Sequence, residues 1–315
     1  MHQERTKVIC MTPVKNEEWI IDRFLQAASV WADYIIVADQ YSSDHTVEIC
    51  QKYPKVILIR NDAKSFNEEE RQKLLIKEAR KIPGKKLLVA LDADEFLTGN
   101  VQCEEWLQML EAASGTVFRM KWPCIASDFR HYWMTDGDSN LFAVIDDGKP
   151  HQGREMHSIR VPMNEESVIC DVKQIQVMHF QYTDWARMKC KNLWYQCYER
   201  VHHPEKRVTE IYRMYHHMDV HRRKSEIPSD WFKIYRTNGI DLSNQPELKE
   251  GYWWEKEIGS FLHDYGKEYF QYIDFPENKN ALLTYLRQTQ FLWKLRYGKA
   301  LLRRLDPCVE KILVR

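Results

Sequence analysis

An apolar run followed directly by acidic residues constrains the possible folds of this chain more than any other stretch. Residues 87–91 read LLVAL, and Asp92, Asp94 and Glu95 follow directly. Such a run is typical of a strand buried in the middle of a parallel sheet, where ligands bind beyond the carboxyl ends of the strands. Asp92 and Asp94 project to the same side of an extended backbone, so both can approach one divalent cation. A D-x-D triplet also arises by chance on solvated loops, and its position after a core strand is what favours a function.

The chain before this run repeats a strand-and-helix pattern. We expect strands at 7–12, 34–39, 56–60 and 87–91, and helices at 16–28, 42–52 and 67–81. Asn16 is the predicted N-cap of the first helix. The alternation predicts an α/β fold, with a mostly parallel sheet flanked by helices. Right-handed crossovers then bring all strand carboxyl ends to one edge. The polar residues expected there are Thr12 beside Pro13, Asp39, Asp62, Asp92 and Asp94.

Composition and motifs exclude several classes of protein. The charges of the 46 basic and 46 acidic residues cancel, so the chain has no net positive charge to attract nucleic acid. We therefore expect no nucleic-acid partner. No G-x-G-x-x-G follows the first strand and no G-x-x-x-x-G-K-[ST] occurs, which disfavours a dinucleotide-binding domain and a P-loop. The eight cysteines form no C-x-x-C pair and no zinc-like spacing. Together with the absence of an apolar leader or a run of ~18 apolar residues, this predicts reduced thiols in a cytoplasmic protein.

Several linked motifs resemble one enzyme family. Residues 13–18, 38–46, Arg71 and 91–96 have the order and spacing found in inverting, family 2-like glycosyltransferases with a GT-A fold. The D-A-D-E-F form is similar to that of lipopolysaccharide-core and capsule transferases. The resemblance implies transfer of a sugar from a nucleotide-diphosphate sugar to a glycan or glycolipid acceptor. Gln40 stands where many members carry a second acid or an asparagine, so the sequence does not determine which nucleotide the donor carries.

The resemblance also implies roles for the residues at the predicted edge. Thr12 and Pro13 would line the base pocket, Asp39 would bind the base or ribose, and Arg71 would lie near the nucleotide. Asp92 would contact the ribose, and together with Asp94 the metal-bridged diphosphate. Glu95 would brace the turn.

A histidine follows a later apolar run. Residues 175–180 are predicted to form a strand that places His179 at its end. In related transferases such a histidine completes the metal site, which would then comprise Asp94, Asp92 and His179. The cofactor would be Mn²⁺ or Mg²⁺, and imidazole beside carboxylates suits Mn²⁺ better. The alternative is a histidine at the edge of the core.

The catalytic base is the least determined residue. We expect a strand at 116–122, an acceptor loop at 123–153 and another strand at 154–162. Glu155 is the first candidate for the base that removes the acceptor proton, and Asp138 is the second. Either residue could instead be an ordinary surface acid.

The last third of the chain has a different character. We expect a transferase domain at 1–200 and a helical extension, rich in charge and aromatic residues, at 201–315. From Phe291 onward, apolar residues recur with a roughly helical period among lysines and arginines. This tail could contact an anionic membrane surface, or it could pack on the protein with a solvated basic face. The first alternative would place the enzyme at the inner face of the membrane.

Two other functions remain open from the sequence. A nucleotidyltransferase shares this sheet architecture, but it would carry a loop rich in glycine and lysine after the first strand. Residues 12–16 contain no glycine. A catalytically silent module that binds a glycan or a nucleotide would keep the pockets without the reaction.

Overall fold

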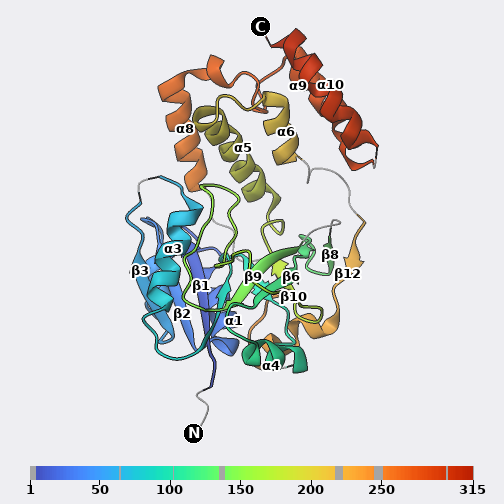
Figure 1. The fold of residues 1–315 in the computed structure, drawn as a ribbon. Coiled ribbons are helices and arrows are strands. Elements are labelled where there is room, and N and C mark those ends of the chain that lie inside the picture. Colours follow the sequence, from blue (N-terminus) through green and yellow to red (C-terminus); the bar gives the residue numbers. More distant parts are fainter. Residues whose placement is uncertain are drawn as a thin grey trace. The chain divides into compact units, whose positions relative to one another are not determined.

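The chain forms two compact units in the computed structural model, which describes residues 5–63, 65–101, 103–134, 139–216, 223–244, 251–295 and 297–314 (Figure 1). The sheet unit comprises Met1–Thr183 and Lys224–Lys249, and the helical unit comprises Asp184–Arg223 and Glu250–Arg315. The division into domains at 1–200 and 201–315 stays a prediction.

The main sheet of the sheet unit has seven strands in the order β10-β6-β9-β4-β1-β2-β3. Its strands are β1 (Lys7–Val14), β2 (Tyr34–Asp39), β3 (Val56–Arg60), β4 (Lys86–Ala90), β6 (Val117–Lys121), β9 (Ser139–Ile145) and β10 (Ile169–Asp171). β1 pairs in parallel with β2 and β4, and β2 pairs in parallel with β3. Among the strands that the structure describes in this sheet, only β9 runs antiparallel to its neighbours β4 and β6. The predicted α/β fold with a mostly parallel sheet is confirmed.

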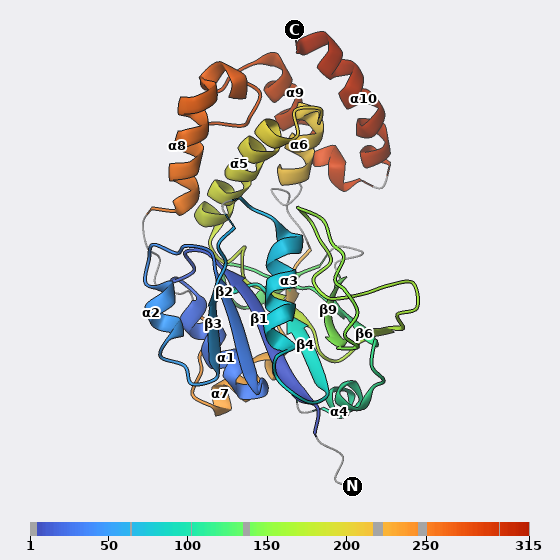
Figure 2. The same ribbon diagram turned by 60° about the vertical axis from the view of Figure 1, so that its left-hand side comes forward.

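Helices cover both faces of this sheet because side chains alternate along each strand. Val8 and Cys10 of β1 belong to the core cluster that also holds residues of α1 and α4, whereas Ile9 and Met11 pack with residues of α3. Figure 2 shows α3 lying across one face of the strands. The helices of this unit are α1 (Ile21–Trp31), α2 (Thr46–Cys50), α3 (Glu68–Ala79), α4 (Glu104–Glu111) and α7 (Lys233–Thr237).

The first helix begins later than predicted, and Asn16 does not cap it. α1 starts at Ile21, and Asn16 has a left-handed backbone with φ of 56°. The Asn16 amide donates to Ser42 Oγ over 2.8 Å, and Asn16 Oδ1 accepts from the Ser43 amide over 2.7 Å. An asparagine tolerates this conformation better than most residues. Asn16 therefore joins the loops after β1 and β2, and its prediction as an N-cap is wrong.

A second sheet of five strands follows the acidic turn, in the order β12-β8-β7-β11-β5. Its strands are β5 (Glu95–Leu97), β7 (Cys124–Ile125), β8 (His131–Trp133), β11 (Val177–His179) and β12 (Ser225–Glu226). β11 runs antiparallel to β5, with His179 opposite Glu95. The strand predicted around 175–180 is confirmed in this shorter form.

Two predictions for the middle of the chain are wrong. The expected acceptor loop at 123–153 contains β7, β8 and β9, and β9 is an internal strand of the main sheet. The expected strand at 154–162 is irregular backbone with bends. The backbone amides of Arg154 and Ser158 donate to side-chain oxygens of Ser158 and Glu68 and not to the carbonyls of a neighbouring strand.

The helical unit contains α5 (Trp185–His202), α6 (Val208–His216), α8 (Trp253–Tyr265), α9 (Ala281–Thr289) and α10 (Gly298–Leu313). α10 starts at a glycine because a Cβ on Gly298 would lie 2.0 Å from the Leu292 carbonyl oxygen. The predicted helical C-terminal region is confirmed. Among the described residues, no helix combines the length and the apolar character needed to cross a membrane.

Candidate active site

Thr12 lies two residues before the carboxyl end of β1, and Asp39 is the last residue of the neighbouring strand β2. The strand register places Thr12 opposite Val37, Pro13 opposite Ala38 and Val14 opposite Asp39. Thr12 is 0% exposed and Asp39 is 8% exposed. Thr12 Oγ1 and Asp39 Oδ1 are buried and have no hydrogen-bond partner among the described residues. An unsatisfied buried polar atom costs roughly 1–3 kcal/mol, so a ligand that supplies the missing partners would bind favourably at this edge.

Arg71 occupies the first turn of α3, which the loop after β3 brings to the same edge. Asn67 caps this helix by accepting from the Glu70 amide over 3.0 Å. The Arg71 guanidinium lies over the Phe66 ring at 5.0 Å, and its Nε is buried without a partner in the described structure. A fixed guanidinium with an unused donor is suited to a phosphate or a carboxylate.

The acidic turn after β4 is held by four hydrogen bonds that involve its backbone. The Leu91 amide donates to the Met11 carbonyl over 3.1 Å, and the Asp92 amide donates to Glu95 Oε2 over 2.8 Å. The Glu95 amide returns to the Asp92 carbonyl over 3.0 Å, and the Phe180 amide donates to the Asp94 carbonyl over 2.8 Å. Glu95 therefore braces the turn, as expected, and β11 lies directly against it.

The turn brings Asp94 and His179 together. His179 Nε2 lies 3.8 Å from Asp94 Oδ1, and each residue is 5% exposed. The imidazole stacks on the Trp122 ring, with centroids 4.6 Å apart and planes 14° apart, which fixes the plane of the ring. The described residues contain no group of three or more His, Cys, Asp or Glu side chains placed to hold a metal ion. The protein thus offers one carboxylate and one imidazole here.

Arg160, which the sequence reasoning missed, binds the other two acids of the turn. Its Nη2 lies 3.1 Å from Asp92 Oδ2 and 3.1 Å from Glu95 Oε1, and its Nη1 donates to Glu95 Oε2. The guanidinium also lies over the rings of Trp122 and Phe142, at 5.3 Å and 5.1 Å. Asp92 is therefore oriented by a buried cation, while Asp94 faces the histidine.

Burial and charge determine the protonation of this cluster. Burial raises the pKa of Glu95 to about 7, although the positive charge of Arg160 opposes the shift. Burial alone would lower the pKa of Arg160, but the carboxylates of Asp92 and Glu95 raise it above its ordinary value. Arg160 stays charged, and Glu95 titrates close to neutral pH.

One loop, residues 151–160, connects α3 to the acidic turn. The Glu68 amide donates to the Glu155 carbonyl over 2.8 Å, and the Ser158 amide donates to Glu68 Oε2 over 2.8 Å. A Cβ on Gly153 would lie 2.3 Å from Ser158 Oγ, so the loop closes tightly on itself. Glu155 is an exposed residue of this loop, next to the first turn of α3. Asp138, the second candidate base, lies outside the described residues.

A sheet whose carboxyl edge presents a D-x-D turn is the arrangement of GT-A glycosyltransferases. Residues 9–168 match the family described as Glycosyl transferase family 2, and this match covers half of the chain. The chain belongs to this family. Glycosyl transferase family 2 is a family of enzymes. No curated protein matches the chain.

Solved structures resemble the chain at low identity. Glucosyl-3-phosphoglycerate synthase from Mycobacterium tuberculosis is 18% identical, with a TM-score of 0.28 over 38% of this chain and 44% of that chain. Mannose-1-phosphate geranyltransferase from Thermus thermophilus is 16% identical, with a TM-score of 0.27 over 46% and 51%. 4-Diphosphocytidyl-2C-methyl-D-erythritol synthase is 10% identical, with a TM-score of 0.29 over 83% and 99%. This chain spans less than half of the first structure's length.

Proposed function

We propose that the protein is an inverting, metal-assisted glycosyltransferase that moves a sugar from a nucleotide-diphosphate sugar to a hydroxyl of a glycan or glycolipid. The observation that carries this proposal is the buried pair of Asp94, in the turn after the central strand β4, and His179, at the end of β11, whose side chains lie 3.8 Å apart. A carboxylate and an imidazole at the carboxyl edge of the sheet are suited to bind a divalent cation, and that cation can bind the diphosphate of the donor.

The nucleotide would bind along the edge formed by β1, β2 and α3. Thr12 and Pro13 would contact the base, Asp39 the base or ribose, and Arg71 the diphosphate. The buried, unpartnered atoms of Thr12, Asp39 and Arg71 support these roles, because each gains a hydrogen bond from a polar ligand. Asp92, oriented by Arg160, would contact the ribose.

Asp94 and His179 fit a divalent cation, with Mn²⁺ favoured over Mg²⁺ by the imidazole. Oxygens of the donor diphosphate and water would supply the remaining ligands, since the described residues contain no set of three or more His, Cys, Asp or Glu side chains placed to hold a metal ion. We assign Asp92 a weaker part in the metal site, because Arg160 already binds its carboxylate. When bound, such a cation neutralises charge on the leaving diphosphate.

Glu155 is our proposed base for the acceptor hydroxyl, with Asp138 as the second choice. Two observations support Glu155: it is exposed, and its loop is hydrogen-bonded to α3 at one end and ion-paired to the acidic turn at the other. An acceptor that reached this loop would meet a carboxylate able to take its proton. We further propose that the enzyme works in the cytoplasm, at the inner face of a membrane where its acceptor is a glycolipid.

Hydrolysis of a panel of nucleotide sugars with Mn²⁺ tests the proposal. We expect one donor to release its nucleoside diphosphate, and Asp94→Asn to slow this release by about 100-fold through loss of leaving-group stabilisation. The control is Asp171→Asn, an exposed aspartate with a side chain 67% accessible, which should react like the wild type. Release of pyrophosphate in a parallel assay with a nucleoside triphosphate and a sugar 1-phosphate would instead indicate a nucleotidyltransferase. Binding without turnover of any donor or acceptor would indicate a silent module.

A further inference from the structure

The last helix exposes a row of apolar side chains. Tyr297, Leu301, Leu305 and Ile312 are 80%, 48%, 42% and 64% exposed. Their spacing, with exposed Cys308 between the last two, places them along one side of α10. An exposed apolar row of this length on a helix is typical of a binding surface. We name these five residues the α10 stripe.

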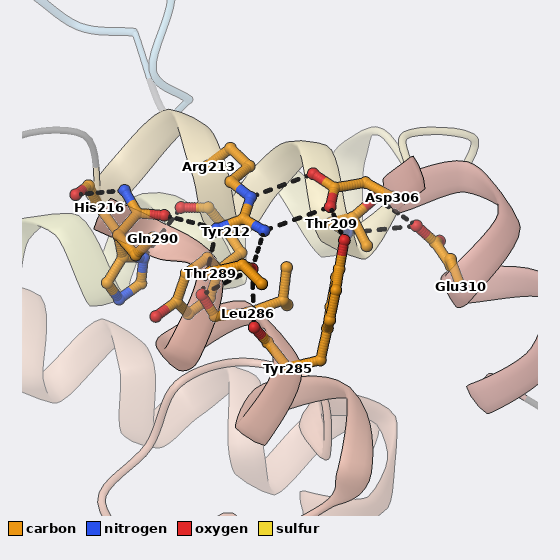
Figure 3. A network of polar contacts seen from close by, with 10 residues as sticks. All are labelled: Thr209, Tyr212, Arg213, His216, Tyr285, Leu286, Thr289, Gln290, Asp306 and Glu310. Atoms are coloured by element: carbon orange, nitrogen blue, oxygen red, sulfur yellow. Dashed lines mark hydrogen bonds and ion pairs between the residues drawn. The ribbon is translucent and has the colours of Figure 1, made fainter. Parts of the chain in front are cut away.

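A different side of α10 is fixed to the helical unit by a buried ion pair (Figure 3). Arg213 of α6 donates through Nε to Asp306 Oδ2 over 3.0 Å and through Nη2 to Asp306 Oδ1 over 3.2 Å. The same guanidinium donates to Gln290 Oε1 over 2.8 Å and to Thr289 Oγ1 over 2.6 Å. Leu302, one turn before Asp306, is fully buried. The stripe cannot turn inward without breaking this network.

The second acid of α10 is also held internally. Glu310 accepts from the Val208 amide over 3.1 Å, and from the amide and hydroxyl of Thr209 over 3.2 Å and 2.6 Å. It thereby caps the first turn of α6. Asp306 and Glu310 are the acidic residues of α10. The exposed charges of the helix are therefore all positive: Lys299, Arg303, Arg304 and Lys311.

We propose that α10 binds the surface of an anionic phospholipid bilayer, with the stripe in the interfacial layer and Arg304 and Lys311, the two cations that flank it at helical spacing, against the headgroups. An apolar row beside basic residues is the pattern of helices that lie in a membrane interface. Each lysine or arginine near an anionic surface contributes about a fivefold gain in affinity. A second copy is the poorer occupant, because a symmetric pairing of this face would bring like charges together.

This inference rests on the helical unit alone. It agrees with a glycolipid acceptor in the proposed function, but vesicle binding is measured without donor, acceptor or metal. Vesicle binding could therefore be observed even if the protein is not a transferase. Transferase activity could likewise be observed even if the protein does not bind vesicles.

Co-sedimentation of the full chain with vesicles tests the inference. One vesicle preparation contains phosphatidylcholine alone, and the other contains equal parts of phosphatidylcholine and phosphatidylglycerol. We expect binding to the anionic vesicles that weakens as salt is raised. The triple variant Leu301→Ser, Leu305→Ser, Ile312→Ser should lose binding by at least tenfold, whereas Leu107→Ser, which removes an equally exposed leucine of α4, should bind normally.

Variants that remove positive charges test whether binding depends on the cations of α10 or on positive charge anywhere in the helical unit. The variant Arg304→Gln, Lys311→Gln should lose about 25-fold in affinity for anionic vesicles. Its control removes two exposed lysines elsewhere in the helical unit, Lys189→Gln and Lys256→Gln, and should lose far less. Wild-type protein that stays in the supernatant with both vesicles would overturn the inference. So would equal binding by the stripe variant, or light scattering that shows the stripe joining two copies while vesicles are ignored.

Discussion

Arg160 neutralises two carboxylates that the acidic turn forces into proximity. Replacing it by leucine would leave Asp92 and Glu95 together with no buried cation. We predict that Arg160→Leu lowers the free energy of unfolding by about 3 kcal/mol at pH 8, since a partly protonated Glu95 relieves only some of the repulsion. Urea denaturation followed by circular dichroism measures this change.

The matched control for Arg160 is another arginine paired with an aspartate. Arg119 lies 3.2 Å from Asp171, with side chains 41% and 67% exposed. Arg119→Leu should cost less than about 1 kcal/mol, because exposed ion pairs contribute little. Similar losses for the two variants would mean that the cluster around Arg160 is not a buried ion-pair network.

Glu95 gives the folded protein a pH dependence of a definite sign. Burial raises its pKa from 4.5 to about 7, so between these values the native state holds a proton that the unfolded chain has lost. The stability contributed by this group is present in full below pH 4.5 and is lost as the pH rises through about 7. The loss amounts to about 3 kcal/mol at most.

Unfolding free energies of the wild type and Glu95→Gln across this range measure the effect. The wild-type value should fall relative to that of Glu95→Gln as the pH rises, because glutamine cannot titrate. Parallel curves would show that Glu95 has an ordinary pKa in the folded protein.

The positions of site residues were predictable to different degrees. Asp92, Asp94 and Asp39 directly follow apolar runs, and the rule that parallel strands end at one edge was enough to gather them. Arg160 lies 65 residues from Glu95 in the sequence. No local pattern reports a contact of that separation. The only available signal was a cation between apolar Ile159 and Val161, which an exposed strand residue would also explain.

At the scale of elements, the first turn of α3 links the nucleotide edge to the loop at 151–160. Asn67 caps this turn, so Asn67→Ala should destabilise the protein by about 1 kcal/mol, whereas Asn67→Ser should keep most of the cap. Thermal unfolding monitored by calorimetry distinguishes the two variants. Equal melting temperatures would mean that the cap carries no stability.

Strands of the main sheet were predictable where they are continuous apolar runs. β1, β2, β3 and β4 follow the predicted segments because helices cover both faces of the sheet. β9 was missed because its apolar residues lie in a segment rich in aspartate and glycine, which is typical of a loop. The irregular segment at 154–162 resembled a strand by its alternation, but its polar groups bind α3 and the acidic turn.

At the scale of the whole molecule, the two compact units should respond separately to damage. Arg213→Met removes the cation from the buried network of α6, α9 and α10. We expect faster hydrogen exchange in the described helices of the helical unit and unchanged protection in β1, β2 and β4. Loss of protection in both units together would show that they unfold as one.

The route of the chain through the two units was beyond sequence reasoning. Residues Lys224–Lys249 return to the sheet unit after the first helices of the helical unit. The returning segment pairs through the two-residue strand β12, and Tyr235 donates its hydroxyl to the Leu97 carbonyl over 2.6 Å. A strand of two residues has no periodicity to detect.

The central claim is that Asp94 and His179 bind a cation that also holds the donor's diphosphate. Calorimetric titration of UDP and GDP, with and without Mn²⁺, tests it most directly on the wild type, Asp94→Asn and the control Asp171→Asn. We predict that Mn²⁺ strengthens binding of one nucleotide by at least about tenfold in the wild type and in Asp171→Asn, and not in Asp94→Asn. Nucleotide affinity that is unchanged by both the metal and the Asp94 substitution would contradict the account.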